Sequence, residues 1–174
     1  MIKNHPMIRT LVNLRGNTRA CVYTEPLWGI PFNLYMPYVS IYMSALGVSD
    51  SQIGFIASIS LVFQIIGSLL SGMITDKLGR KRATMIFDVI GWSIPCLIWA
   101  FSQNFYYFLV AAIINSFNRV TMNSWGCLLV EDCDRSQIIN IYAWVNISGL
   151  VAVFFAPITG LFIGKYDLVP TIRV

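Results

Sequence analysis

The chain has 174 residues, of which 56% are hydrophobic and only 11% are charged. A soluble domain usually carries about 25% charged residues, so this composition excludes a globular protein in water and predicts an all-α polytopic membrane protein. The net charge of +4 does not indicate nucleic-acid binding, because eight of the twelve Lys and Arg residues precede the first apolar run or fill one short loop.

The amino-terminal part of the chain combines a basic segment with a proline-containing apolar run. Residues 1–22 are polar and basic, and we expect them on the cytoplasmic side as a short segment along the membrane. The first span is predicted at about residues 23–46. Proline removes a backbone donor and can kink a helix, so this span should face an interior cavity, with Pro31 as a hinge and Asn33 as a polar lining residue.

The second span is predicted at about residues 51–74, a stretch of 24 residues without a charge. This length crosses a hydrocarbon core of about 30 Å at about 1.5 Å per residue. The turn before it holds no cation and is expected outside, with Ser49 or Asp50 as the helix cap. Small residues four positions apart in this span predict close packing against another helix.

A basic loop, residues 72–82, joins the second span to the third. Short loops rich in Lys and Arg remain on the cytoplasmic side, because they are costly to translocate. The loop therefore predicts that both it and the N-terminus are cytoplasmic. Gly79 is expected to adopt a positive φ, and Asp76 is expected to cap the turn or to pair with a neighbouring cation.

Three further spans are predicted at about residues 83–101, 106–130 and 136–164. The connection after the third span is expected outside. The connection after the fourth is expected inside and is acidic, because it contains Glu131, Asp132 and Asp134. Residues 23–167 would then form one partial membrane domain, and residues 168–174 would begin a sixth span that the chain does not complete.

Arg119 is the most informative single residue, because it falls near the bilayer midplane within the fourth predicted span. A charge at that depth costs about 2.5–3.5 kcal/mol, so the side chain should face a cavity or a partner. Asn115 and Asn123 lie four positions on either side and share its helix face. The residues therefore predict either a substrate cavity or gating site, or else a hydrated or ion-paired structural arginine.

Residue types that carry enzyme chemistry are not grouped in this sequence. The four cysteines show no Cys-x-x-Cys spacing, and the single histidine, His5, has no ligand partners nearby. We find no Ser/His/Asp set, no paired carboxylates within a span and no phosphate-binding loop. The sequence therefore predicts no metal site, no cofactor and no enzymatic activity.

The basic loop follows a pattern of a glycine, an aspartate four positions later, a basic residue, a second glycine and a basic triplet. The residues that meet this pattern are Gly72, Asp76, Lys77, Gly79, Arg80, Lys81 and Arg82. With its place between the second and third spans, the loop resembles the signature of the major facilitator superfamily (MFS) of transporters. Thr75 and Leu78 are mild departures from that signature.

The resemblance implies an N-terminal transporter half of six spans, built as an inverted three-plus-three repeat, of which this chain holds five. Spans one and four would line a central cavity, and spans two and five would meet a C-terminal half. In span five, Pro157 and Gly160 are the matching residues and are expected to serve as hinge and packing positions. The other positions of an antiporter element are not met there, which disfavours an antiporter.

The resemblance also implies that the basic loop is a latch, which holds one conformation of an alternating-access cycle. Glu131 and Asp132 are predicted on the same side of the membrane, so Arg80 is hypothesised to pair with one of them. A half-exposed pair contributes about 1 kcal/mol, which suits a switch. The alternative is that the two loops are solvated independently.

Together these features predict the N-terminal portion of a secondary transporter that moves a small solute across the cell membrane. Its expected partners are the lipid bilayer, the solute and the C-terminal half of the transporter. The alternative is a truncated, non-transporting remnant or an accessory membrane subunit. The residues do not identify a substrate or a coupling ion.

Overall fold

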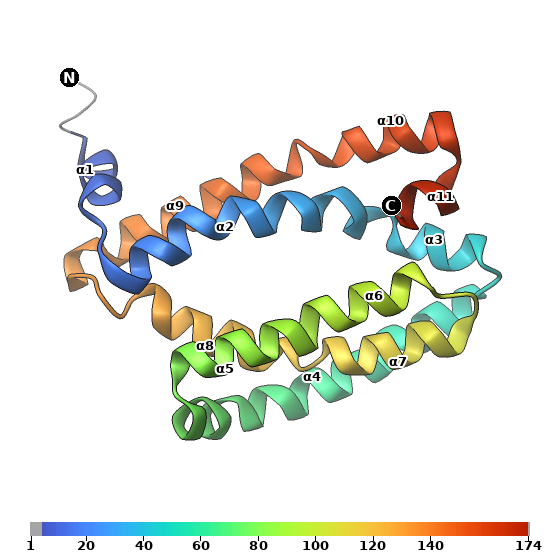
Figure 1. Ribbon diagram of the computed structural model, residues 1–174, viewed down its shortest axis with the longest axis horizontal. Helices are drawn as coiled ribbons and strands as arrows, with labels where there is room; N and C mark the ends of the chain where they lie inside the picture. The colour runs from blue at the N-terminus through green and yellow to red at the C-terminus, as the bar shows by residue number, and fades with distance from the viewer. Residues whose placement is uncertain (1–4, 174) are drawn as a thin grey trace. The chain divides into compact units, whose positions relative to one another are not determined.

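The computed structural model describes residues 5–173 (Figure 1). Residues 1–4 of the predicted basic segment, and Val174, lie outside this range. Every regular element within it is helical. The α-helices are α1 (Pro6–Asn13), α2 (Gly16–Tyr35), α3 (Val39–Ala45), α4 (Asp50–Leu78), α5 (Arg80–Asp88), α6 (Ile94–Ala100), α7 (Phe105–Asn115), α8 (Asn118–Leu129), α9 (Ile138–Val153), α10 (Ala156–Tyr166) and α11 (Leu168–Arg173).

Three helical segments are long and apolar enough to cross a membrane: Asp50–Leu78, Arg80–Ala100 and Arg135–Tyr166. The 29 residues of α4 extend over about 44 Å at about 1.5 Å per residue, which exceeds a hydrocarbon core of about 30 Å. Large apolar side chains on α4 point outward, and Leu69 is 76% exposed. The protein is therefore an all-α membrane protein, as its composition predicts.

Capping residues set both ends of α4. Ser49 accepts a hydrogen bond from the Gln52 backbone N–H, while the Gln52 side chain accepts one from the Ser49 backbone N–H. This reciprocal pair satisfies two donors that the first helical turn leaves open. The prediction of a cap at Ser49 is thus confirmed. At the other end, Gly79 has a φ of 80°, which ends α4 before α5 begins at Arg80.

Three of the predicted spans contain interrupted helices, whereas the range 51–74 lies within the continuous helix α4. The range 23–46 contains α2, a 3-10 turn at Met36–Tyr38 and α3. The range 106–130 contains α7 and α8, with a break between Asn115 and Asn118. The range 136–164 contains α9 and α10. Two of the breaks coincide with prolines, Pro37 and Pro157, which cannot donate to the carbonyl four residues earlier.

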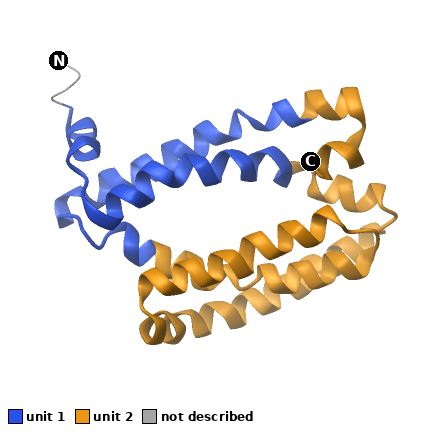
Figure 2. Cartoon of the chain, in the orientation of Figure 1, with its two compact units in different colours: residues 1–36, 126–159 blue, residues 37–125, 160–174 orange. Residues whose placement is uncertain are grey.

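The chain divides into two compact units (Figure 2). Unit 1 comprises residues 1–36 and 126–159, and its main packing joins α2 to α9. Gly29 of α2 permits this approach, because a Cβ there would lie 3.3 Å from the Cβ of Ala152. Helix α1 packs on α9, where the Asn140 amide donates to Thr10 Oγ1 at 3.0 Å.

Unit 2 comprises residues 37–125 and 160–174, and it contains the packed helices α4, α5, α6 and α7. Tyr42 and Phe108 are almost fully buried in it, with their rings edge to face at 5.7 Å. The Tyr42 hydroxyl donates to the Trp99 carbonyl at 3.0 Å and accepts from Arg173 Nε at 3.1 Å. These contacts fix α11 against α3 and α6.

Candidate functional site

Arg119 on α8 is hydrogen-bonded to Gln64 on α4. Its Nε donates to Gln64 Oε1 at 2.9 Å, and its Nη2 donates to the same oxygen. Gln64 is the fifteenth of the 29 residues of α4, so the pair lies near the middle of a membrane-crossing helix. Within residues 5–173 the structure defines no ion pair for Arg119. A neutral amide orients the guanidinium without cancelling its charge.

The network continues from Gln64 to the break between α7 and α8. Gln64 Nε2 donates to Ser60 Oγ at 3.0 Å, and this hydroxyl lies 3.5 Å from Ser116 Oγ. The Ser116 hydroxyl also reaches the carbonyl oxygens of Ser60 and Ala112, at 3.2 Å and 2.9 Å. A hydroxyl that bonds to the carbonyl four residues earlier competes with the helix ladder and often bends it. Ser116 therefore joins the break to α4.

Gly67 allows α4 and α8 to approach closely beside this network. A Cβ at Gly67 would lie 3.2 Å from the Ser116 carbonyl oxygen and 3.6 Å from Arg119 Cβ. Small residues have this role in membrane helices, where backbone proximity replaces a hydrophobic driving force. The network thus depends on a glycine as well as on its polar members.

A π-helical segment, Val89–Ser93, lies between α5 and α6 and packs against α7. The sequence explains this departure from α-helical hydrogen bonding, because Pro95 has no N–H to donate to the Gly91 carbonyl four residues earlier. The Asn115 amide donates to that carbonyl at 2.7 Å instead. Asn115 thus satisfies an acceptor that proline leaves open within a membrane-crossing segment.

The structure separates the polar residues that were predicted to share one face of the fourth span. Arg119 contacts α4, whereas Asn115 contacts the π-helical segment. Asn123 is exposed on α8, and no hydrogen bond joins either asparagine to Arg119 within the described residues. Asn33 belongs to unit 1, where its amide donates to the Gly29 carbonyl at 2.8 Å. Their roles in a substrate cavity remain predictions.

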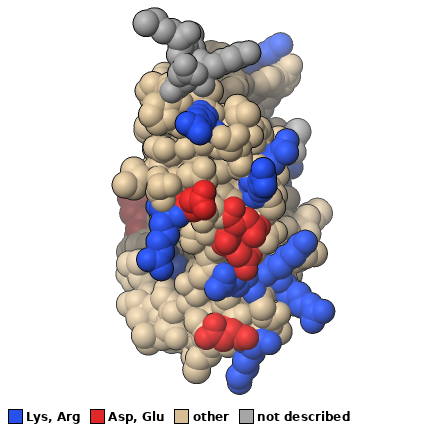
Figure 3. All heavy atoms as spheres, turned by 90° about the vertical axis from the view of Figure 1, so that its left-hand side faces the viewer, with Lys and Arg blue, Asp and Glu red and all other residues tan. Residues whose placement is uncertain are grey.

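The basic loop forms a tight helix–helix turn in unit 2. The Gly79 N–H donates to the Thr75 carbonyl, and the φ of Gly79, 80°, agrees with the sequence prediction. Gly72 faces open space, because no atom of residues 5–173 lies within 4 Å of the position of a Cβ there. Figure 3 shows Lys, Arg, Asp and Glu side chains at the surface of the molecule. The latch role of this loop remains a prediction.

The acidic loop caps the first turn of α2 within unit 1. Asp132 Oδ2 accepts from the Asn17 backbone N–H at 2.6 Å, and Glu131 Oε2 accepts from the Asn17 amide at 2.9 Å. The Asp132 N–H donates to Thr18 Oγ1 at 3.2 Å. Helix α2 has no side-chain cap of its own, and its first turn contains no acidic residue. The loop therefore supplies both the acceptor and the negative charge that a helix N-terminus favours.

Gly16→Ala is expected to destabilise unit 1 by about 2 kcal/mol. Gly16 has a φ of 52°, and a Cβ there would overlap Asp132 Oδ2. An alanine would have to adopt the left-handed region and displace the capping carboxylate, at a cost of about 1 kcal/mol for each effect. Equilibrium unfolding in detergent measures the loss. Gly149→Ala is the matched control, because no atom of the described residues lies within 4 Å of its Cβ position. Equal stabilities would contradict the cap.

Cys133 is expected to react slowly with maleimides at neutral pH. Burial raises the pKa of its thiol, and the charges of Asp134 and Asp132 raise that pKa further. Only the thiolate is nucleophilic, so a raised pKa lowers the reactive fraction and the rate should increase with pH. Labelling is followed in a variant that retains Cys133 alone. Asp134→Asn should accelerate labelling at constant pH, and an unchanged rate would contradict the electrostatic part of the explanation.

The three predicted hinge and packing residues occupy different kinds of position. Pro31 lies inside α2, which continues past it. Pro157 is the second residue of α10, after the helical ladder breaks at Phe154 and Phe155. Gly160 is a close-packing position, because a Cβ there would lie 2.9 Å from the Tyr38 hydroxyl. Whether any of them moves during function remains a prediction.

Sequence reasoning did not anticipate the partners that organise these regions. Gln64 was expected only as part of the packing seam of the second span, and Ser60 was not singled out, although a polar pair four residues apart in an uncharged span is a usable signal. The capped residues Asn17 and Thr18 gave a weaker signal. Only the absence of an acidic residue after Gly16 indicates that another segment must supply the cap.

Comparison with known proteins identifies the family of the chain. The family model of the Major Facilitator Superfamily matches residues 28–168, which is most of the sequence. The chain belongs to this superfamily. The curated relatives of this MFS member include the uncharacterized MFS-type transporter YqjV of Bacillus subtilis (strain 168), which is 28% identical over 139 residues. That match covers 76% of this chain and 33% of the relative.

Two further relatives of this MFS member carry the name multidrug resistance protein MdtG. The protein from Serratia proteamaculans (strain 568) is 27% identical over 171 residues, covering 94% of this chain and 41% of the relative. The protein from Rahnella sp. (strain Y9602) is 26% identical, covering 83% and 36%. The chain thus spans about a third to two fifths of the relatives' length. No solved structure matches it.

Proposed function

We propose that this MFS member forms part of a secondary transporter that moves a small solute across the cell membrane by alternating access. The observation that carries the proposal is the Arg119–Gln64 pair, a charge held near the middle of a membrane-crossing helix by a neutral partner. Ionisable residues within membrane spans are costly and mark substrate or ion pathways. Membership of a transporter superfamily supports the same assignment.

The proposed architecture is the N-terminal half of such a transporter. It assigns five spans to α2 with α3, α4, α5 with α6, α7 with α8, and α9 with α10, arranged as an incomplete inverted three-plus-three repeat. The N-terminus and the basic loop lie in the cytoplasm. A C-terminal half provides the other side of the solute pathway, and the protein has no enzymatic activity. Interrupted helices support this assignment, because broken spans in transporters lie at binding sites.

In this proposal Arg119 contacts the solute directly or controls access to it. Its guanidinium has five donors, and Gln64 Oε1 accepts from two of its nitrogens. The remaining donors suit an acceptor-rich or anionic group on the solute. Asn33, Asn115 and Asn123 are proposed as further polar groups of the pathway. Two relatives are named multidrug resistance proteins, so drug-like organic compounds are the first solutes to examine.

The basic loop is proposed as a conformational latch. Arg80 pairs with Glu131 or Asp132 in one state of the cycle, and Gly79 maintains the turn that presents it. Such a pair contributes about 1 kcal/mol at the surface, which biases two states without preventing their exchange. Both carboxylates also accept hydrogen bonds from Asn17 in the first turn of α2, so Asn17 is an alternative partner to Arg80.

Solute flux in membrane vesicles tests the proposal. The complete product of the gene is expressed, and everted vesicles are energised with a proton or a sodium gradient. Cationic, neutral and anionic drug-like compounds are then offered in turn. Saturable, gradient-dependent uptake of at least one class is the expected result. If the protein inserts and folds but no class is transported, the accessory or non-transporting alternative is favoured instead.

A further inference from the structure

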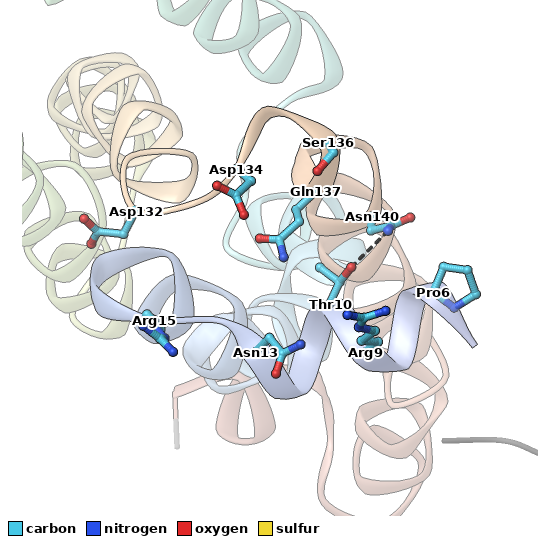
Figure 4. A pocket seen from close by; sticks show the side chains of 10 residues that line it. All are labelled: Pro6, Arg9, Thr10, Asn13, Arg15, Asp132, Asp134, Ser136, Gln137 and Asn140. Atoms are coloured by element: carbon cyan, nitrogen blue, oxygen red, sulfur yellow. Dashed lines mark hydrogen bonds between the residues drawn. The ribbon is translucent and has the colours of Figure 1, made fainter. Parts of the chain in front are cut away.

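A polar cleft of about 890 Å³ lies within unit 1, between α1 and the segment that leads into α9 (Figure 4). Asp134 and Gln137 extend into it from that segment, and α1 forms the opposite wall. Its volume is in the range of small-molecule sites, about 300–1,000 Å³. The lining residues are Pro6, Arg9, Thr10, Asn13, Arg15, Asp132, Asp134, Ser136, Gln137 and Asn140.

The charges of the cleft are mixed. Arg9 on α1 and Arg15 before α2 provide two guanidinium groups, and Asp134 provides a carboxylate. Within residues 5–173 the structure defines no side-chain hydrogen bond for any of the three. Asp132 differs, because its Oδ2 already accepts from the Asn17 N–H at 2.6 Å. The cleft thus offers donors for an anionic group and a separate acceptor for a cationic one.

Contacts with α9 hold α1 in place as a wall of the cleft. Trp144 Nε1 donates to the Met7 carbonyl at 3.0 Å, and the Asn140 amide donates to Thr10 Oγ1 at 3.0 Å. The cleft lies at the first residues of α2 and α9, and the segment Arg135–Tyr166 is long and apolar enough to cross a membrane. This position places the cleft at the membrane–water boundary.

The two helices that flank the cleft, α1 and α9, also carry exposed apolar side chains outside its polar lining. Val12, which precedes Asn13, is 72% exposed, and Ile139, which precedes Asn140, is 81% exposed. A ligand that fits both surfaces has a polar head and an apolar tail. We propose that the cleft binds the headgroup of a phospholipid that carries both a phosphate and a primary ammonium group.

Each charged part of the headgroup has a side chain of opposite charge in the cleft. Arg9 and Arg15 donate to the phosphate, since guanidinium groups match phosphate oxygens well. Asp134 accepts from the ammonium group. A headgroup that is only anionic would meet the repulsion of Asp134 and Asp132, so it binds more weakly. A trimethylammonium headgroup has no N–H to donate, so it is also disfavoured.

Lipid retention measures this selectivity independently of any transport. The full chain in mixed micelles is equilibrated with equal amounts of phosphatidylethanolamine and phosphatidylglycerol, and bound lipid is counted by native mass spectrometry. Phosphatidylethanolamine should predominate over phosphatidylglycerol and over phosphatidylcholine. Replacing both arginines, Arg9→Gln with Arg15→Gln, should weaken its binding about tenfold. Arg19→Gln removes one positive charge from an α2 residue outside the cleft and should have no effect.

Asp134→Asn provides a result that misfolding does not mimic. It should weaken phosphatidylethanolamine binding and strengthen phosphatidylglycerol binding in the same sample. Equal retention of both lipids by the wild type, or a double arginine variant that binds normally, would overturn the proposal. Soluble glycerophosphoethanolamine should compete poorly. Competition as effective as that of the lipid would overturn the assignment to a membrane lipid, because the acyl chains would then contribute nothing.

Discussion

Gly91→Ala is expected to destabilise the protein by about 3 kcal/mol, the upper part of the range for overpacking a well-packed core. A Cβ at Gly91 would lie 2.7 Å from the backbone nitrogen of Asn118 and 2.9 Å from its Cα. Backbone atoms cannot change rotamer as a flexible side chain can. The π-helical segment and α8 must therefore move apart to make room for the methyl group. That movement also stretches the 2.7 Å bond from the Asn115 amide to the Gly91 carbonyl.

Equilibrium unfolding in detergent, followed by helical circular dichroism, measures this effect. Gly54→Ala is the matched control, because it adds the same methyl group to a membrane helix at a position where no atom of the part of the chain that the structure describes lies within 4 Å. The control should be unchanged or slightly stabilised, since alanine favours helix by about 1 kcal/mol over glycine. Gly91→Ala with the stability of the control would show that these two segments pack less closely than described.

Arg80→Glu is expected to lower solute flux at least tenfold, if the latch stabilises one state of the transport cycle. The substitution replaces an attraction with a repulsion, so the shift in the conformational equilibrium exceeds the contribution of the original pair, about 1 kcal/mol. Flux and insertion are measured in the same vesicles. Arg135→Glu is the control for a charge reversal in a loop outside the latch, and it should retain most of the flux.

A second charge reversal identifies the partner. Glu131→Arg in the Arg80→Glu background should restore flux to within a few fold of the wild type. Glu131 is tested first, because it accepts from the Asn17 side-chain amide. Asp132 accepts from the Asn17 backbone N–H, so its replacement would also remove the cap of α2. Failure of both Glu131→Arg and Asp132→Arg to restore flux would indicate two independent loops.

Features that depend on local chemistry were predictable from the sequence. Composition indicated an all-α membrane protein, and the capping residue Ser49 and the positive φ of Gly79 followed from their positions at the ends of one apolar run. The family resemblance rested on the basic loop, residues 72–82, and the family match over residues 28–168 confirms that resemblance. In each case neighbouring residues determine the outcome, so no tertiary information is needed.

Features that depend on which helices meet were not predictable. Helical spacing put Asn115 and Arg119 on one face, yet a break between α7 and α8 directs them to different neighbours. Hydropathy averages over such breaks, because they change backbone hydrogen bonds and leave the apolar content unaltered. The cap that Asp132 provides for α2 joins positions 115 residues apart, which no local pattern encodes.

Flux through the complete gene product with Arg119→Ala is the most direct test of the proposed transport function. The account predicts at least a tenfold loss of flux with normal insertion, since one charged hydrogen-bonding group of the pathway is removed. Arg119→Lys should recover part of it by restoring the charge. Arg19→Ala, which removes an exposed cation stacked on Tyr23, should transport normally. Wild-type flux in a correctly inserted Arg119→Ala protein would contradict the account.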